Sequence, residues 1–338
     1  MTPLRHLSAA EVAGAMPPPE QRLALAEQTM RALGHGAELP PKMGVHPRQA
    51  GSLAQAMPAL LRGEAEDGST DLIGVKWITG FPVNPTIGLP TYHALVVLND
   101  PVTGQPLAVM DAAAITAQRT AAISGTAIRH FLPAGPERGQ RPTNVAILGA
   151  GVQARSHIPM IGYLLPGARV RLVDVDRARA NSLVEELSKA SGIGFVEAVG
   201  SVREAVETAE VVISVVSFGP DHQALDPNWL GPSTLFIAVD HDMQAPAALA
   251  REALFVVDDR DQFLAMRTGP EFAGYPDPDV TLGELFRGEA SAQRRGGGDG
   301  PAARVLVAHL GVGLADVVFA AAIFARAVDL GLGRLLPR

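Results

Sequence analysis

The spacing of apolar residues divides the first 131 residues into helical and strand-like stretches. Residues 8–11 (SAAE) have the spacing of a helix capping box, and apolar residues recur at helical intervals from Glu20 to Leu33. Short apolar runs between proline, glycine and Asn-Asp turns are typical of strands over residues 71–110. Residues 111–131 are rich in alanine and free of proline, which favours a helix. This part of the chain is predicted to join helices to a mostly antiparallel sheet.

Strands and helices are predicted to alternate beyond residue 143. The predicted strands are the apolar runs 144–149, 169–175, 211–216, 235–240 and 254–259. Helices are expected from about residue 152 and over about 178–189, and Ser201 with Glu204 has capping-box spacing before a shorter one. This alternation is typical of a parallel, doubly wound sheet with helices on both faces.

Two loops and an apolar tail predict how the chain is organised. The loop 132–143 separates the two patterns and predicts a first domain over residues 1–133 and a second, doubly wound domain over residues 134–314. A final apolar helix within 315–338 is expected to pack back on the first domain, and residues 293–301 (QRRGGGDGP) are expected to form a surface loop. The sequence thus predicts an α/β protein of two domains.

A glycine-rich turn follows the first predicted strand of the second domain. Gly149, Gly151 and Ala154 satisfy the pattern G-x-G-x-x-A between a strand and a helix. The first glycine permits a tight turn, the second lets backbone approach a pyrophosphate, and the small alanine lets helix and strand pack closely. The backbone amides of Val152 and Gln153 are then expected to bind the phosphates. The alternative is a turn that serves packing alone.

Asp174 stands at the end of the next predicted strand. A carboxylate at this place accepts a hydrogen bond from the ribose 2′-hydroxyl of a dinucleotide and repels a 2′-phosphate. The sequence therefore predicts NAD(H) rather than NADP(H) as the cofactor. Arg177 and Arg179 lie just beyond and weaken this preference.

Several longer blocks are more specific than the glycine pattern. They include LGAGVQARSHI at 148–158, GVKWITGFPVNP at 74–85 and GVGLADVVFAA at 311–321. Together with PPKMGVHP, AMPAL, VVDDRDQ and TLGEL they run in order from about residue 40 to the end of the chain. In these blocks the sequence resembles the ornithine cyclodeaminase/mu-crystallin family.

The resemblance implies a Rossmann domain beside a mixed α/β domain that binds the substrate and forms a homodimer. Members of the family transfer a hydride between a nicotinamide and the carbon that bears an amine or imine next to a carboxylate. They include ornithine cyclodeaminase, alanine dehydrogenases of the same fold, ketimine and pyrroline-carboxylate reductases, opine-type dehydrogenases and a crystallin. The resemblance therefore implies a small amino acid or cyclic imino acid as the substrate.

Such chemistry needs cations that fix the substrate carboxylate, and three positions offer one. Lys76 lies in an otherwise apolar predicted strand, where an unpaired ammonium is costly to bury, and Arg119 lies within the alanine-rich helix. Arg119 resembles the family's carboxylate-binding arginine, Lys76 is also a candidate catalytic residue, and Lys42 matches a family position that carries Arg or Lys. The alternative for Lys76 and Arg119 is an internal salt bridge, and for Lys42 a surface position.

Asp242 is predicted to orient the reacting amine and to move protons. It follows the predicted strand 235–240, at the carboxyl end of the sheet, where ligands bind in open α/β folds. It matches the catalytic aspartate of a Gly-x-Asp segment in the family. This chain carries Asp240 in place of that glycine, followed by His241. The change either redirects the loop, adds a second titrating group, alters the space for the substrate or caps the next helix.

The choice among functions depends partly on Gln55. Ornithine-using members of the family carry an acid just before the Met-Pro pair, where this chain has Gln55 and Ala56, which weakens the case for a substrate with a distal ammonium. Thr120 and Ser217 are further predicted cofactor contacts. The main hypothesis is an NAD-dependent enzyme of the ornithine cyclodeaminase type. The alternatives are an imine reductase or amino-acid dehydrogenase, and a ligand-binding protein without catalysis.

Composition excludes several other classes of function. The net charge is −7 and the longest basic cluster is the pair Arg294 and Arg295, which argues against a nucleic-acid partner. The chain has no cysteine, and its nine histidines lack the spacing of metal ligands, so we predict no metal. The N-terminal residues lack the apolar core of a secretory signal and charges interrupt the apolar tail, which predicts a cytoplasmic protein without a membrane span.

Overall fold

The chain forms two compact units. The computed structural model describes residues 3–132, 142–187, 192–219, 221–290 and 304–337. Unit 1 comprises residues 1–119 and 311–338, and unit 2 comprises residues 120–310. The boundary after residue 119 falls inside helix α3 (Ala113–Phe131), whereas the sequence pattern predicts it at the loop after that helix. Most of the predicted loop 132–143 and all of the predicted loop 293–301 lie outside the described residues.

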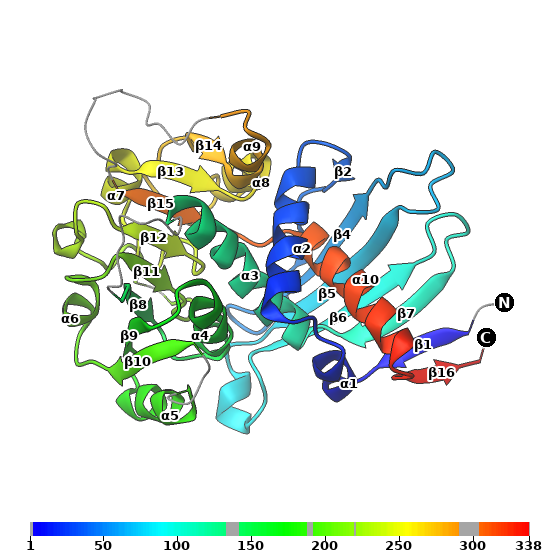
Figure 1. Cartoon of the computed structure of the whole chain (residues 1–338), viewed down its shortest axis with the longest axis horizontal. Coiled ribbons are helices and arrows are strands. Elements are labelled where there is room, and N and C mark those ends of the chain that lie inside the picture. The colour runs from blue at the N-terminus through cyan, green and yellow to red at the C-terminus, as the bar shows by residue number, and fades with distance from the viewer. Residues whose placement is uncertain (1–2, 133–141, 188–191, 220, 291–303, 338) are drawn as a thin grey trace. The chain divides into compact units, whose positions relative to one another are not determined.

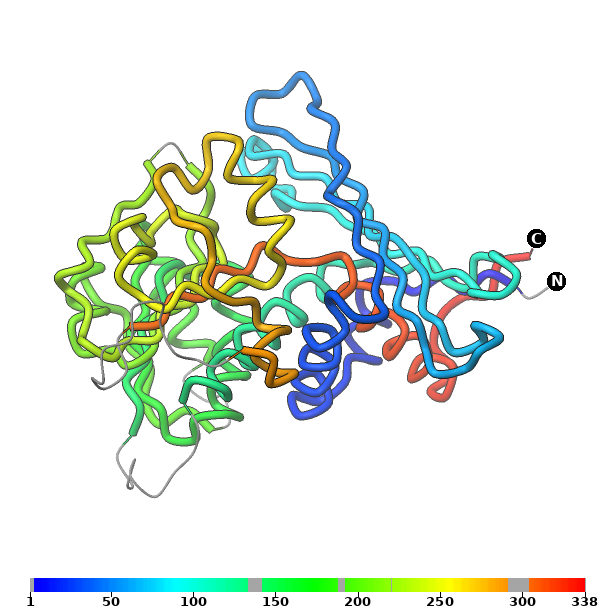
Figure 2. The backbone as a smooth tube through the Cα atoms, turned by 90° about the horizontal axis from the view of Figure 1, so that it is seen from above, coloured from blue at the N-terminus to red at the C-terminus, as the bar shows by residue number. Residues whose placement is uncertain are grey.

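Unit 1 is built on a mixed sheet that has eight strands among the described residues (Figure 1). The strands are β1 (Leu4–Leu7), β2 (Ala37–Glu38), β3 (Met43–Val45), β4 (Leu53–Leu61), β5 (Leu72–Gly80), β6 (Tyr92–Asn99), β7 (Pro106–Asp111) and β16 (Arg334–Leu336). Their order is β16-β1-β7-β6-β5-β4-β2, with β3 also paired to β4. β1 and β7 run parallel and the other pairs are antiparallel, which confirms the mostly antiparallel sheet. The β1–β16 pair brings segments near the two chain ends side by side (Figure 2).

Among the described residues, three helices lie wholly within unit 1, besides the short 3₁₀ helix η1 (Asn84–Ile87). They are α1 (Ala9–Gly14), α2 (Pro19–Ala32) and α10 (Gly313–Asp329). The capping box predicted at residues 8–11 is present, since Ser8 and Glu11 each accept a hydrogen bond from the other's backbone amide. Helix α10 packs on β4, β5 and β6. It begins with glycine because a Cβ on Gly313 would lie 2.7 Å from the carbonyl oxygen of Met57.

Unit 2 contains the predicted doubly wound sheet, whose eight strands among the described residues all run parallel. The strands are β8 (Asn144–Leu148), β9 (Ala168–Val173), β10 (Ile193–Ala198), β11 (Val211–Ser214), β12 (Leu235–Ala238), β13 (Leu254–Val257), β14 (Val280–Thr281) and β15 (Val305–Ala308). Their order is β10-β9-β8-β11-β12-β15-β13-β14. The five predicted strands are confirmed, and β10, β14 and β15 are additional.

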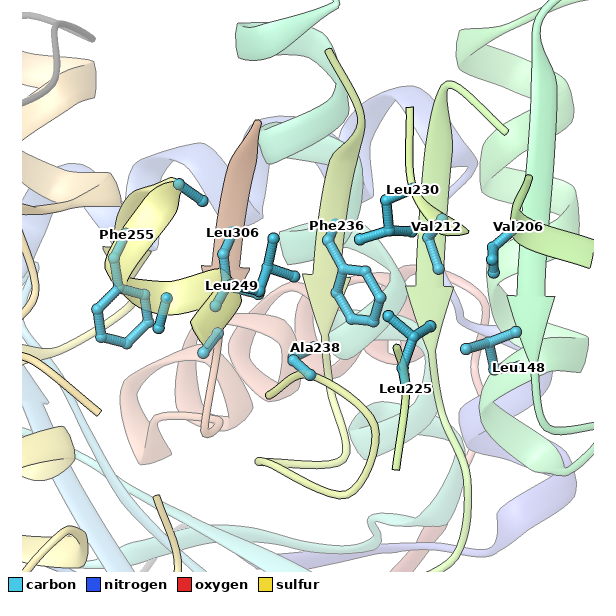
Figure 3. Packing of buried hydrophobic residues seen from close by; sticks show 14 of the residues in the cluster. Leu148, Val206, Val212, Leu225, Leu230, Phe236, Ala238, Leu249, Phe255 and Leu306 are labelled. Atoms are coloured by element: carbon cyan, nitrogen blue, oxygen red, sulfur yellow. The ribbon is translucent and has the colours of Figure 1, made fainter. Parts of the chain in front are cut away.

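The helices of unit 2 follow the predicted alternation. Besides the larger part of α3, the described residues of unit 2 form α4 (Val152–Leu164), α5 (Arg177–Leu187), α6 (Val202–Val206), α7 (Ala247–Glu252), α8 (Arg260–Met266), α9 (Leu282–Arg287) and a 3₁₀ helix η3 (Pro227–Trp229). Ser201 caps α6 as predicted, but the Glu204 carboxylate accepts from the amide of Gly200. Apolar side chains such as Val212, Phe236 and Leu306 form the core on one face of the sheet (Figure 3). This core fixes the strand ends that carry the candidate site.

Candidate active site

The glycine-rich turn of unit 2 has the backbone geometry that its sequence predicts. Gly149 has φ +104°, and a Cβ at this residue would lie 2.7 Å from the carbonyl oxygen of Val215, so only glycine fits. Gly151 is the N-cap of α4, and a Cβ there would meet no atom within 4 Å. The first turn of α4, which begins with Val152 and Gln153, therefore opens onto accessible space at the positive end of a helix.

The strand order reverses between β8, which leads into this turn, and β11. Ligands of open α/β sheets bind in the crevice outside the carboxyl ends of the strands at such a reversal. Ser217 lies just beyond β11 and is exposed. Thr120 is buried in α3. The structure thus brings the glycine turn and the β11 end together at the carboxyl edge of the sheet.

Asp174 follows β9 and is tied to the glycine turn. Its Oδ2 atom accepts a hydrogen bond from the amide of Ala150 at 2.7 Å, and Oδ1 accepts from the amide of Asp176 at 2.8 Å. The guanidinium of Arg179 lies 4.0 Å from Oδ1. A carboxylate has about four lone-pair sites, so these two bonds leave capacity for a ribose hydroxyl.

Asp242 is completely buried and held from two sides. Its Oδ1 atom lies 2.8 Å from Nδ1 of His222, and its Oδ2 accepts from the amide of Phe272 at 2.9 Å. His222 keeps about a third of its side-chain surface exposed, with a relative value of 35%. The His222 interaction was not predicted because the two residues are far apart in sequence and no motif joins them.

Asp240 does not cap the next helix, which corrects one of the interpretations of the sequence. Helix α7 begins at Ala247 and has Pro246 as its N-cap. The side chain of Asp240 instead contacts the end of β11. Its Oδ2 atom accepts hydrogen bonds from Ser214 Oγ and, at 3.1 Å, from the amide of Val216. Burial raises the pKa of Asp240 to about 7, although these hydrogen bonds oppose the shift.

His241, between the two aspartates, adopts a left-handed backbone conformation with φ +60°. Non-glycine residues seldom occupy this region. The imidazole packs against the rings of Phe218 and Phe272, at centroid distances of 4.8 and 5.8 Å. These contacts help to hold a conformation that a glycine would adopt more easily.

A second buried polar group of unit 2 was not predicted. Ser124 Oγ lies 2.8 Å from Nε2 of both His157 and His309, and all three side chains are buried. His157 Nδ1 donates to the carbonyl of Gln153, and burial lowers the pKa of His157 to about 4. His157 is therefore neutral and accepts from Ser124, which in turn accepts from His309. The chain of bonds links the start of α4 to the end of β15.

In unit 1 the two predicted cations share one carboxylate. Lys76 Nζ lies 2.7 Å from Oδ2 of Asp316, and Arg119 Nε lies 3.2 Å from Oδ1. All three side chains are buried, Lys76 and Asp316 almost completely. The internal salt bridge that was the alternative interpretation is therefore present. Asp316, on α10, was not predicted as its partner.

The cluster of Lys76, Arg119 and Asp316 holds two cations against one anion. Burial and the neighbouring Arg119 lower the pKa of Lys76 to about 8, although Asp316 opposes the shift. A pKa in this range lets the amine hold or release a proton near neutral pH. The surplus positive charge also leaves the cluster suited to a second anion.

Lys42 is half-buried and lies directly before β3. Met43 pairs with Ala56 on β4, and Met57 pairs with Lys76 on β5. Extending the β3–β4 register by one residue therefore places Lys42 in the same row as Met57 and Lys76. Aligned residues face the same side of a sheet. The structure thus brings Lys42 within two strands of the cation cluster.

No group of three or more His, Cys, Asp or Glu side chains in the described part of the chain is arranged to hold a metal ion. No helix within the described ranges is long and apolar enough to cross a membrane.

Comparison with known proteins identifies the family. The sequence model of the ornithine cyclodeaminase/mu-crystallin family matches residues 8–329. The chain belongs to this family. The nodulation efficiency protein NfeD of Rhizobium meliloti is 32% identical over 340 residues, which cover 99% of both chains.

Solved structures of similar fold support the two-unit architecture. The Δ1-pyrroline-2-carboxylate reductase of Thermococcus litoralis, solved with NADH and L-proline, has a TM-score of 0.81 at 22% identity and covers 98% of this chain and 100% of its own. An archaeal alanine dehydrogenase dimer with bound NAD also has a TM-score of 0.81, at 24% identity, and covers 99% of each chain. This ornithine cyclodeaminase/mu-crystallin family member thus shares their α/β fold over nearly its whole length.

Proposed function

We propose that this family member is an NAD-dependent oxidoreductase of a small α-amino or α-imino acid. Unit 1 would bind the carboxylate of the substrate, and unit 2 would bind the dinucleotide. The reaction would interconvert a carbon–nitrogen single bond and the corresponding imine next to that carboxylate.

The observation that carries this proposal is the buried cluster of Lys76, Arg119 and Asp316 in unit 1. Its two cations face one carboxylate, so a second carboxylate completes the charge balance. Arg119 uses Nε toward Asp316, and a guanidinium has five N–H donors, so Arg119 can also bind a substrate carboxylate. A carboxylate fixed in this way holds the adjacent carbon in one orientation.

The groups that support binding of a dinucleotide all lie in unit 2. The Gly149 turn, the open first turn of α4 and the carboxylate of Asp174 are the groups that hold a pyrophosphate and an adenine ribose in doubly wound folds. The names of the similar structures include NADH and NAD, which supports the same cofactor here. A bound nicotinamide would supply or accept the hydride.

Two residues are proposed to handle the substrate's nitrogen and protons. The carboxylate of Asp242, fixed by His222 and the Phe272 amide, would orient the amine or imine nitrogen. The pKa of Lys76, lowered to about 8 by burial, suits a group that gives up or takes a proton during the reaction. Reduction adds a hydride to the imine carbon and a proton to its nitrogen, and oxidation removes both.

The polar side chain at position 55 favours a reaction without cyclisation. Gln55 lies in β4 opposite Ile78, and it cannot form an ion pair with a distal ammonium. A cyclodeaminase substrate carries such an ammonium. We therefore propose an imine reductase or amino-acid dehydrogenase rather than an ornithine cyclodeaminase.

A homodimer is part of the proposal because one face of the unit 1 sheet exposes apolar side chains. Ile73, Trp77 and Leu95, on the neighbouring strands β5 and β6, retain 39, 45 and 44% of their surface. Contiguous exposed apolar side chains of this kind mark association surfaces. A second copy of the chain is the partner we propose, as in the alanine dehydrogenase dimer.

The test is a panel of substrates followed by NADH absorbance. NADH should be consumed with a cyclic imino acid such as Δ1-pyrroline-2-carboxylate, or formed from NAD⁺ with L-alanine or L-proline. L-ornithine with NAD⁺ serves as the discriminating arm, with ammonia measured in the same sample. Ammonia without accumulating NADH would replace the proposal with a cyclodeaminase, and no turnover with any member would overturn the enzymatic function.

Replacing Asp174 with serine should weaken NADH binding by about tenfold and NADPH binding by much less. The carboxylate accepts from the 2′-hydroxyl and repels a 2′-phosphate, so its loss removes an attraction in one case and a repulsion in the other. Fluorescence titration of both nucleotides measures this change. Asp176→Ser is the matched control, because Asp176 lies two residues on and is exposed. An equal loss for both nucleotides would remove Asp174 from this role.

A further inference from the structure

Asp240 is a buried carboxyl with only one of its two oxygens in use. Oδ2 accepts from Ser214 Oγ and from the amide of Val216, but Oδ1 is buried without a hydrogen-bond partner among the described residues. A buried carboxylate with an unpartnered oxygen is costly, which favours the protonated form. In agreement, burial raises the pKa of Asp240 to about 7. Its charge therefore changes near neutral pH.

The contacts of Asp240 lead directly to the proposed dinucleotide crevice. The amide that it accepts from belongs to Val216, and the carbonyl of the preceding residue, Val215, lies against Gly149 of the glycine turn. Asp240 follows β12, the neighbour of β11, on the side away from β8. Because neighbouring strands lie about 4.8 Å apart, the carboxyl is within one or two strand spacings of the crevice between β8 and β11.

We propose that Asp240 couples pH to the redox state of the nicotinamide that the protein binds. An oxidised nicotinamide ring carries a positive charge and a reduced ring carries none. The ionised carboxylate of Asp240 attracts the oxidised ring, whereas the protonated carboxyl does not discriminate between the two. Raising the pH therefore strengthens the binding of NAD⁺ relative to that of NADH.

Other titratable groups face Asp240 and must be separated from it. Asp242 and His241 lie on the same segment, and His222 reaches the segment through Asp242. Burial, together with the charges of Asp242 and Asp240, raises the pKa of the Tyr275 hydroxyl. His309 lies directly after the neighbouring strand β15; its amide donates to the carbonyl of Ala238, and its imidazole contacts Ser124. His222 is the first group to separate from Asp240, because its partly exposed imidazole contacts Asp242 on the same segment.

The inference rests on the proposed binding of NAD(H), and its size follows from simple electrostatics. Two unit charges about 10 Å apart, at an effective dielectric constant near 20, change a binding ratio by about tenfold. The ratio of the dissociation constant for NAD⁺ to that for NADH should therefore fall by about five- to tenfold from about pH 6 to about pH 8.5. NAD⁺ and NADH make the same phosphate and adenosine contacts, so the ratio of their dissociation constants reports only on the interaction with the nicotinamide ring.

The experiment measures the dissociation constants of NAD⁺ and NADH from about pH 6 to about pH 8.5. It compares the wild type with the variants Asp240→Asn and His222→Gln. In Asp240→Asn, which keeps the shape but loses the charge, the ratio should not change with pH. In His222→Gln it should keep most of the wild-type pH dependence. A pH-dependent ratio in Asp240→Asn, or its loss in His222→Gln alone, would overturn the proposal. Failure of the wild type to bind either nucleotide would instead overturn the proposed function.

A measurement on the unmodified protein covers the case in which Asp240→Asn does not fold. Calorimetric binding at about pH 7 in two buffers of different ionisation enthalpy gives the number of protons taken up. Because the oxidised ring favours the ionised carboxylate, binding of NADH should take up more protons than binding of NAD⁺. Equal proton uptake for the two nucleotides would contradict the coupling.

Discussion

Replacing Arg119 with alanine should lower kcat/KM for the amino or imino acid on the order of a thousandfold. The guanidinium would bind the substrate carboxylate through two charge-assisted hydrogen bonds, each worth about 1.5 to 3 kcal/mol. The dissociation constant for NADH should stay within about twofold, because we assign Arg119 to the substrate carboxylate and the Gly149 turn, α4 and Asp174 to the nucleotide. Steady-state kinetics with the active substrate of the panel and a fluorescence titration of NADH measure the two effects.

Two further variants make this result specific. Arg119→Lys keeps the charge but loses the planar fork, so it should recover only part of the activity. Arg62→Ala is the control, since Arg62 lies in the same unit and pairs with Glu38 at an exposed position. Retained turnover in Arg119→Ala would show that the carboxylate binds elsewhere. An equal loss in Arg62→Ala would point to a general effect of removing a cation.

Most of the strands predicted in unit 2 are continuous apolar runs; the exception is β9, where apolar residues alternate with Arg169 and Arg171. β8, β11, β12 and β13 are buried along nearly their whole length, and a strand covered on both faces is apolar throughout. β10 is an edge strand with a mixed burial pattern, so it lacks the continuous apolar run that marks the buried strands. β15 is buried, but its apolar run is close to that of α10 and does not separate from it by periodicity alone.

The sequence predicted individual residues of the candidate site, but it did not predict which other residues they contact. Burial of Lys76 in an apolar strand requires an anion, and that requirement was evident from the sequence. The anion, Asp316, lies on the last helix, and only the packing of α10 on the sheet brings it to Lys76. Ser124, His157 and His309 likewise meet only because the fold brings α3, α4 and the end of β15 together. Contacts between distant segments depend on topology, which local patterns do not encode.

Asp316→Asn should lower the free energy of unfolding of unit 1 by about 3 to 5 kcal/mol, because it leaves two buried cations without their anion. Lys76→Met should change it by less than about 1 kcal/mol, because Arg119 and Asp316 then balance each other and methionine fills a similar volume. Denaturant unfolding measures both values. A Trp229→Phe background leaves Trp77, on β5 of unit 1, as the one tryptophan of the sequence.

These two variants separate the stability of the cluster from its function. Lys76→Met should lose most turnover while staying folded, since the surplus cation is the part that we assign to the substrate. Glu38→Gln, which breaks the exposed pair with Arg62, should cost under about 1 kcal/mol and serves as the control. If Lys76→Met is as destabilising as Asp316→Asn, then Lys76 is needed to neutralise Asp316. The second positive charge would then serve the fold, and the main observation behind carboxylate binding would be lost.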